Sequence, residues 1–193
     1  MAGERAVTAR GAARRTALLD AAIEVVAEGG SASLTHRAVA ARVPASLASV
    51  TYHFASIDDL RRAMFEHAGH IVTDQLNDTV ATAMVQRLPE VTADFLVRLI
   101  TEYRNPVVAM HQMIVAAAYD ANLQPTFHVF QRRLGDLLAP CVGGQAAGLT
   151  AAATLQGLLL SALTYPDLDV EQFRSSVVEL IGRLRVTAQL ARP

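Results

Sequence analysis

The stretch THRAVAARVPASLASVTYHFASIDDL, residues 35–60, decides the fold of this chain. It contains two short helix-forming segments separated by Pro44, which ends the first because proline lacks the backbone N–H and crowds the preceding turn. Thr35 and Ser46 stand before the two segments, and residues of these types commonly cap helix N-termini. Two short helices joined by a tight turn predict a helix-turn-helix motif, whose second helix enters the major groove of DNA.

Further helices are expected on both sides of this motif. Residues 10–28 carry apolar side chains at spacings of three and four, which is typical of an amphipathic helix, and a glycine pair follows. Ser56, with Asp59 at the third helical position, predicts a capping box at the start of a longer helix that runs toward residue 87. The first three helices should share a small core made of Leu19, Ile23, Leu34, Val39, Val50 and Phe54.

The composition predicts an all-α protein. The chain has 193 residues, of which 52% are hydrophobic and 18% charged, so it can form one large core or two small ones. Alanine and leucine are abundant, which favours helices, and strand-like alternation is hard to find. Pro140 is expected to end the helix that starts at Gln124. The remaining helices are expected at residues 89–103, 105–117, 124–139, 145–164 and 170–190.

Several features predict a cytoplasmic protein without a membrane partner. Cys141 is the only cysteine, so an intrachain disulfide is impossible and a reducing compartment fits. Residues 1–30 carry charges throughout and offer no core of a signal peptide. No uninterrupted apolar run approaches the ~20 residues that a membrane span needs.

The two terminal helices predict a homodimer. Residues 145–164 are apolar on nearly every side, and residues 170–190 follow with Asp169 as their cap. A helix that is apolar all round must be buried or must pair with a partner. We therefore expect a helical hairpin that forms a four-helix bundle with its copy. The alternative is a thick core within a single chain.

The charge distribution is more informative than the net charge of −1. Residues 1–15 hold four arginines against a single glutamate. A basic segment ahead of a helix-turn-helix can reach phosphates or a minor groove, and the alternative is a solvated tail. The four arginines are Arg5, Arg10, Arg14 and Arg15.

The same region resembles a known family. The resemblance runs from Leu18 to Phe65 through LLDAAIEVVAEGG, LTHRAVAARV, SVTYHF and SIDDL, which resemble the DNA-binding domain of TetR-family transcriptional repressors. It implies a DNA-binding domain over residues 1–56 and an effector-binding and dimerisation domain over residues 57–193. It also implies a double-stranded DNA operator and a small-molecule effector as partners. Two headpieces of a dimer should read a palindrome with half-sites about one helical turn apart.

Candidate DNA contacts lie in the helix-turn-helix. Serine and threonine hydroxyls can bond base edges, methyl groups can touch thymine, and the free N–H groups of a helix start favour phosphates. The resemblance implies that residues 46–51 face the groove. It implies backbone contacts for Thr35, Arg37, Tyr52 and His53. The full candidate set is Thr35, His36, Arg37, Ser46, Leu47, Ala48, Ser49, Thr51, Tyr52 and His53.

Residues 89–139 mix apolar walls with scattered polar groups, which is the composition of a small-molecule pocket. No pocket residue carries over from the family, because its body sequences diverge. The alternative is that the methionines and phenylalanines are plain core, since both are commonly buried. The candidate lining residues are Phe95, Tyr103, Met110, His111, Met113 and Tyr119.

Metal, cofactor and catalytic chemistry are not expected. One helix face carries a cluster that could hold Zn²⁺ or Ni²⁺, although a solvated face is the more ordinary reading. The cluster is Glu66, His67, His70 and Asp74. The chain lacks a nucleophile elbow, a P-loop and a dinucleotide-binding turn, which predicts that it is not an enzyme.

One competing function stays open at this point. The chain could be a helical small-molecule-binding or protein-interaction module with a vestigial headpiece. The low net charge favours this alternative, as does Ile57, which stands where the family usually has a lysine that touches phosphate.

Overall fold

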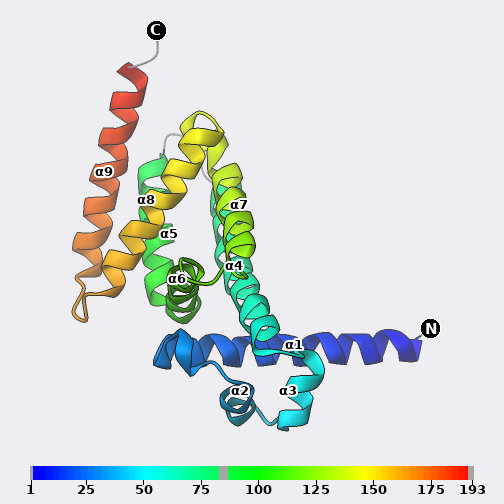
Figure 1. Cartoon of the computed structure of the whole chain (residues 1–193). Coiled ribbons are helices and arrows are strands. Elements are labelled where there is room, and N and C mark those ends of the chain that lie inside the picture. The colour runs from blue at the N-terminus through cyan, green and yellow to red at the C-terminus, as the bar shows by residue number, and fades with distance from the viewer. Residues whose placement is uncertain (1, 83–86, 191–193) are drawn as a thin grey trace. The chain divides into compact units, whose positions relative to one another are not determined.

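The computed structural model describes residues 2–82 and 87–190, with side chains over 11–81 and 87–183 (Figure 1). Within these ranges the regular secondary structure is entirely helical, which confirms the predicted all-α class. The chain divides into two compact units. One comprises Met1–His70 and Val108–His128, and the other comprises Ile71–Val107 and Val129–Pro193. These units are defined by packing, and the division by role at residues 56 and 57 stays a prediction.

The first unit contains the predicted three-helix headpiece. α1 (Ala2–Gly29) leads through a 3-10 turn, η1 (Ser31–Ser33), into α2 (His36–Arg42) and α3 (Leu47–His53). α1 contacts α2, and α2 contacts α3. α1 begins well before the predicted start at residue 10, because the alanine-rich first residues are good helix formers. The predicted core is confirmed, since Leu19, Ile23, Leu34, Val39, Val50 and Phe54 are all buried.

Local capping explains why the headpiece helices begin where they do. Thr35 Oγ1 accepts a hydrogen bond from the Ala38 N–H at 3.0 Å, and Ser46 Oγ accepts one from the Ser49 N–H at 3.2 Å. Each bond satisfies one of the N–H groups that a helix start leaves without an intrahelical partner. Both predicted caps are therefore confirmed.

α4 (Ile57–Thr82) begins at the predicted capping box. The Asp59 N–H donates to Ser56 Oγ at 3.0 Å, and the Ser56 N–H donates to Asp59 Oδ2 at 3.2 Å. The helix starts in the first compact unit and continues into the second. Its predicted extension toward residue 87 lies partly outside the described residues.

The second unit is built on α5 (Leu88–Thr101), which contacts both α8 (Gln145–Leu163) and α9 (Val170–Leu190). Arg174 of α9 pairs with Asp94 of α5, with Nε 2.6 Å from Oδ1. α6 (Arg104–Ala117) starts in this unit, and most of α7 (Gln124–Val142) belongs to it.

Pro140 does not end α7, and that prediction was wrong. The helix continues to Val142 with the proline inside it. The N–H groups of Gly143 and Gly144 both donate to the Ala139 carbonyl, at 3.1 and 3.0 Å. These two glycines have φ of 93° and 126°, a region that glycine adopts without strain. Proline removes only its own hydrogen bond to the preceding turn, and the residues after it stay helical up to the glycine pair that caps the end.

α7 and α8 cross at two glycines. A Cβ atom added to Gly148 of α8 would lie 2.2 Å from the Gly135 carbonyl oxygen of α7 and 3.0 Å from the Ala139 nitrogen. One added to Gly135 would lie 2.7 Å from Leu149 Cδ2. The two backbones therefore approach so closely that no side chain fits between them.

α8 is buried on one side only. Its buried stripe consists of Gly148, Ala152, Leu155, Leu159 and Ala162. Outside this stripe Leu149 and Leu160 are 39% and 46% exposed. Among the described helices, α8 alone is long and apolar enough to cross a membrane. Of its 18-residue apolar stretch, 28% is buried within the chain. This is weak evidence, because core helices of soluble proteins meet the same criteria.

Candidate nucleic-acid interface and ligand cavity

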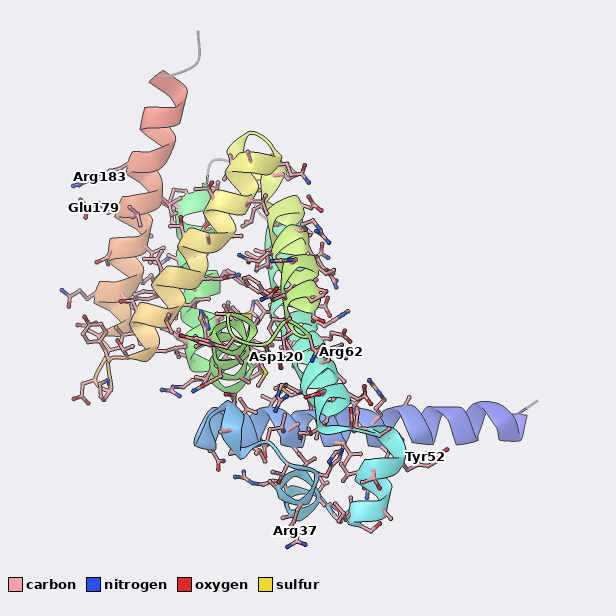
Figure 2. The ribbon with its side chains drawn as sticks, in the orientation of Figure 1. Arg37, Tyr52, Arg62, Asp120, Glu179 and Arg183 are labelled. Carbon is pink, nitrogen blue, oxygen red and sulfur yellow. The ribbon has the colours of Figure 1, made fainter. Side chains whose placement is uncertain are left out.

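The exposed face of α3 is made by the predicted recognition residues. Val50 and Phe54, at 0% and 2% exposure, hold the opposite face in the headpiece core. Tyr52 is 85% exposed and projects outward (Figure 2). The exposed members of the predicted set are Ser46, Leu47, Ala48, Thr51 and Tyr52, and the half-buried ones are Ser49 and His53. α3 thus presents small polar groups and two larger side chains on a surface that base edges can approach.

The three predicted residues at the start of α2 have different surroundings. Thr35 is exposed and acts as the cap. His36 is half-buried, with Nε2 2.9 Å from the Phe54 carbonyl oxygen. Arg37 is exposed and points away from the headpiece (Figure 2), and it has no ion-pair partner among the described side chains. Arg37 is therefore the best placed of the three to meet a phosphate.

Other headpiece arginines are held within the first unit. Arg14 Nη2 donates to the Pro44 carbonyl oxygen at 2.6 Å, and Arg42 Nη1 donates to Glu28 Oε1 at 2.8 Å. The hydrogen bond from Arg42 holds the pKa of the Glu28 carboxyl below its usual value. Two arginines of the basic segment have side chains outside the described residues, Arg5 and Arg10.

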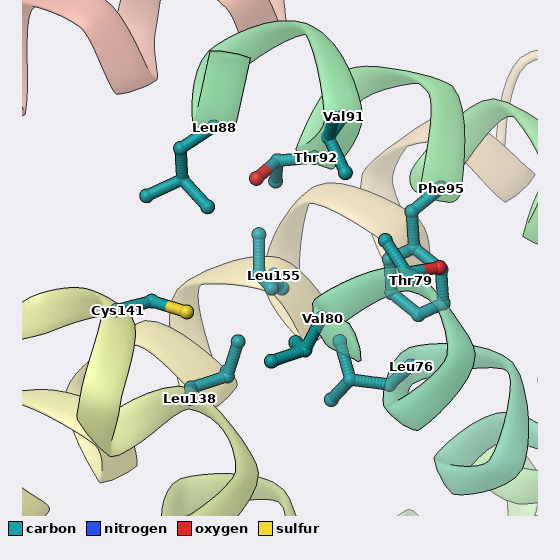
Figure 3. Close-up of a pocket in the computed structure, with 10 residues that line it drawn as sticks. All are labelled: Leu76, Thr79, Val80, Leu88, Val91, Thr92, Phe95, Leu138, Cys141 and Leu155. Atoms are coloured by element: carbon teal, nitrogen blue, oxygen red, sulfur yellow. The ribbon is translucent and has the colours of Figure 1, made fainter. Parts of the chain in front are cut away.

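A small cavity lies inside the second unit, between α4, α5, α7 and α8 (Figure 3). Its volume is about 20 Å³, close to the ~15 Å³ that one water molecule needs. Burial raises the pKa of the Cys141 thiol, so this side chain stays neutral at physiological pH. The described lining residues are Leu76, Thr79, Val80, Leu88, Val91, Thr92, Phe95, Leu138, Cys141 and Leu155.

The predicted ligand residues do not form one group. Phe95 lines the cavity, whereas Tyr103 lies in the same unit outside the described lining. The first unit holds the other four. Of these, Met110, His111 and Met113 are buried, and Tyr119 is 90% exposed. Sequence reasoning did not predict that residues of α4, α7 and α8 line this cavity. The lining residues of α5 recur at helical spacing, which indicated a buried helix face but not a cavity.

The predicted helix-face cluster is not assembled as a metal site. His67 Nε2 lies 2.7 Å from Asp20 Oδ1 of α1, and Arg133 approaches Asp74 at 3.4 Å. In the part of the chain that the structure describes, no three His, Cys, Asp or Glu side chains are arranged to hold a metal ion.

Two family models match this chain. Residues 18–64 match the bacterial regulatory proteins of the tetR family, and residues 83–184 match the tetracyclin repressor-like C-terminal domain. The second match alone spans more than half of the chain. No curated protein sequence matches it.

Solved structures agree with these matches. A TetR-family member from Streptomyces coelicolor A3 is 31% identical, with a TM-score of 0.72 over 86% of this chain and 97% of that one. The multidrug binding protein EbrR complexed with ethidium is also 31% identical, with a TM-score of 0.69 over 89% of this chain and 97% of its own. A transcriptional regulator from Rhodococcus sp. Rha1 shares the fold at 24% identity, with a TM-score of 0.71 over 88% and 95%.

Proteins of this family are soluble regulators and generally not enzymes. The resemblance seen in residues 18–65 is thus confirmed, and the vestigial-module alternative is not favoured. The chain belongs to the TetR family of bacterial regulatory proteins and is a ligand-responsive, DNA-binding transcriptional regulator.

Proposed function

We propose that this regulator is a cytoplasmic, non-enzymatic repressor that binds a palindromic operator as a homodimer and is released by a small molecule. The observation that supports it best is the exposed face of α3, where Tyr52 and Leu47 stand beside small polar residues while Val50 anchors the helix. The recognition set of α3, with Thr35 and Arg37, supplies the DNA contacts. α3 reads base edges, and Arg37 binds phosphate.

The dimer forms through the exposed faces of α8 and α9. Leu160, at 46% exposure, gives the exposed side of α8 a large apolar side chain. Gly157 of α8 and Gly182 of α9 have open space where a side chain would stand, so a partner helix can approach their backbones closely. Two copies of this hairpin complete a four-helix bundle with twofold symmetry.

Replacing Arg37 with Ala is expected to weaken binding to every DNA sequence to a similar extent, about tenfold at low salt. The plot of log affinity against log salt should become shallower by ~0.9, the amount expected for one lost phosphate contact. Fluorescence anisotropy on operator and unrelated DNA measures both quantities. Arg132→Ala, at an exposed position on α7 outside the proposed dimer face, is the control and should change neither. An unchanged salt slope for Arg37→Ala would remove Arg37 from the set of phosphate contacts.

The effector occupies the cavity of the second unit and is neutral and largely apolar. Among the described lining residues there is no charged side chain and one aromatic ring, Phe95. Thr79 Oγ1 already donates to the Gln75 carbonyl at 2.7 Å, and Cys141 is neutral, so the cavity offers few polar contacts. EbrR binds ethidium, a planar cation, and the lining residues that the structure describes include no carboxylate to pair with such a charge.

The cavity, with a volume of about 20 Å³, is too small for an effector and must open further to admit one, because drug-sized ligands need roughly 300 Å³ or more. An effector that binds only the open form shifts the population toward it. α4 forms one wall through Leu76, Thr79 and Val80, and the same helix begins in the headpiece. Opening that displaces α4 changes the spacing of the two recognition helices and lowers operator affinity.

Replacing Thr92 with Leu is expected to fill the cavity and abolish release by effector while leaving operator affinity within about twofold. The measurement is anisotropy of the operator complex titrated with uncharged probes, geraniol and 1-decanol, and with ethidium. Thr101→Leu, at an exposed position of the same helix, is the control and should respond like wild type. Release of the wild-type complex by ethidium and by neither uncharged probe would contradict the neutral-effector proposal.

A further inference from the structure

Two consecutive arginines of α1 hold the two ends of the recognition helix. Arg14 Nη2 donates to the Pro44 carbonyl oxygen at 2.6 Å, just before the Ser46 cap where α3 begins. The Arg15 guanidinium carbon lies 5.2 Å from the centre of the Phe54 ring, and Phe54 is the C-cap residue of α3. Successive side chains of a helix diverge by about 100°, so neighbours can reach targets on either side.

His36 supplies a third contact at the same end of α3. Its Nε2 lies 2.9 Å from the Phe54 carbonyl oxygen, and a carbonyl only accepts, so Nε2 carries the hydrogen. Phe54 is thus held twice, through its ring by Arg15 of α1 and through its carbonyl by His36 of α2. The end of α3 is thereby tied to both other helices of the headpiece.

α3 needs such contacts because it is short. It has seven residues, Leu47–His53, and helices of that length are not stable alone in water. One buried side chain inside the helix, Val50, fixes its depth, but a single anchor leaves the helix free to rotate about it. Contacts at both ends remove that freedom. A charged donor such as Arg14 makes a stronger hydrogen bond than a neutral one.

We propose that Arg14, Arg15 and His36 are positioning residues for operator reading and do not themselves bind DNA. The proposal rests on the repressor function proposed above. It reassigns two arginines of the basic N-terminal segment and one member of the predicted contact set from phosphate binding to the orientation of α3. Base readout depends on helix orientation, whereas non-specific attraction depends on charge. Loss of a positioning residue therefore lowers operator affinity and spares binding to unrelated DNA.

The test compares Arg14→Met with Arg14→Lys by anisotropy on operator and on unrelated DNA at several salt concentrations. Met keeps the apolar stem without the donor, and Lys retains one donor for the Pro44 carbonyl. We expect Arg14→Met to weaken operator binding about tenfold and to change the affinity for unrelated DNA by less than about twofold. The slope of log affinity against log salt should stay the same. Lys should restore a large part of the loss. Equal losses on both DNAs with a shallower slope would show a phosphate contact and overturn the proposal.

His36 gives an independent arm of the same test. Gln can donate to the Phe54 carbonyl and Leu cannot, so His36→Gln should retain operator affinity and His36→Leu should lose it selectively. Unfolding midpoints of all variants separate positioning from folding: unchanged operator affinity with a lowered midpoint would also overturn the proposal. Arg37→Ala serves as the reference for a true phosphate contact. If wild-type protein shows no operator preference at all, the proposed function fails first, and that outcome is visible without any variant.

Discussion

Replacing Leu160 with Asp is expected to convert the dimer to monomers and to lower operator affinity at least a hundredfold, because two linked headpieces gain about 10²-fold or more over one. Leu160 is 46% exposed in the single chain and lies on the apolar side of α8. A carboxylate there would lose its water on dimerisation without gaining a partner, which opposes association. Sedimentation velocity gives the oligomeric state, and anisotropy gives the affinity.

Val129→Asp is the matched control, since Val129 is 58% exposed on α7 and lies outside the proposed dimer face. It should leave both the dimer and operator binding intact. A Leu160→Asp protein that still sediments as a dimer would show that the dimer does not form through the exposed side of α8.

Replacing Gly148 with Ala is expected to destabilise the fold by about 3 kcal/mol or more, at the upper end for overpacked cores. The new Cβ would fall 2.2 Å from the Gly135 carbonyl oxygen, which is backbone and cannot rotate away. α7 and α8 must then separate, and the cavity walls Leu138 and Leu155 separate with them. Urea unfolding at a fixed protein concentration measures the change in the free energy of unfolding.

Gly11→Ala controls for the intrinsic effect of the substitution. A Cβ at Gly11 of α1 meets nothing within 4 Å, so alanine should be neutral or stabilising by up to ~1 kcal/mol. A Gly148→Ala protein as stable as Gly11→Ala would show that the crossing tolerates a side chain.

The parts of the fold that the sequence predicted are those encoded locally. The caps at Thr35, Ser46 and the Ser56–Asp59 box could be predicted because each cap bond joins residues only three positions apart in the sequence. The core residues of the headpiece could be predicted for the same reason, because helical spacing is a local pattern within each helix. The proline prediction failed because Pro140 removes one hydrogen bond to the preceding turn but does not prevent the two residues after it from staying helical.

The parts that could not be predicted depend on contacts between distant residues. Arg14 reaches a carbonyl thirty positions away and His36 one eighteen positions away, and nothing in their neighbourhoods indicates these partners. The cavity was missed for a similar reason. Spacing shows which face of each helix is buried, but Phe95 and Leu155 line a void only because of how α5 and α8 meet.

Operator reading by this headpiece can be tested by selecting bound sequences from a random double-stranded DNA pool with the purified protein. We expect enrichment of one palindrome, with half-sites about one helical turn apart, that unrelated DNA does not displace. Loss of that enrichment in Leu160→Asp would tie the palindrome to the twofold dimer. Recovery of sequences no different from the starting pool, at a salt concentration where the protein still binds DNA, would contradict the claim that this headpiece reads an operator.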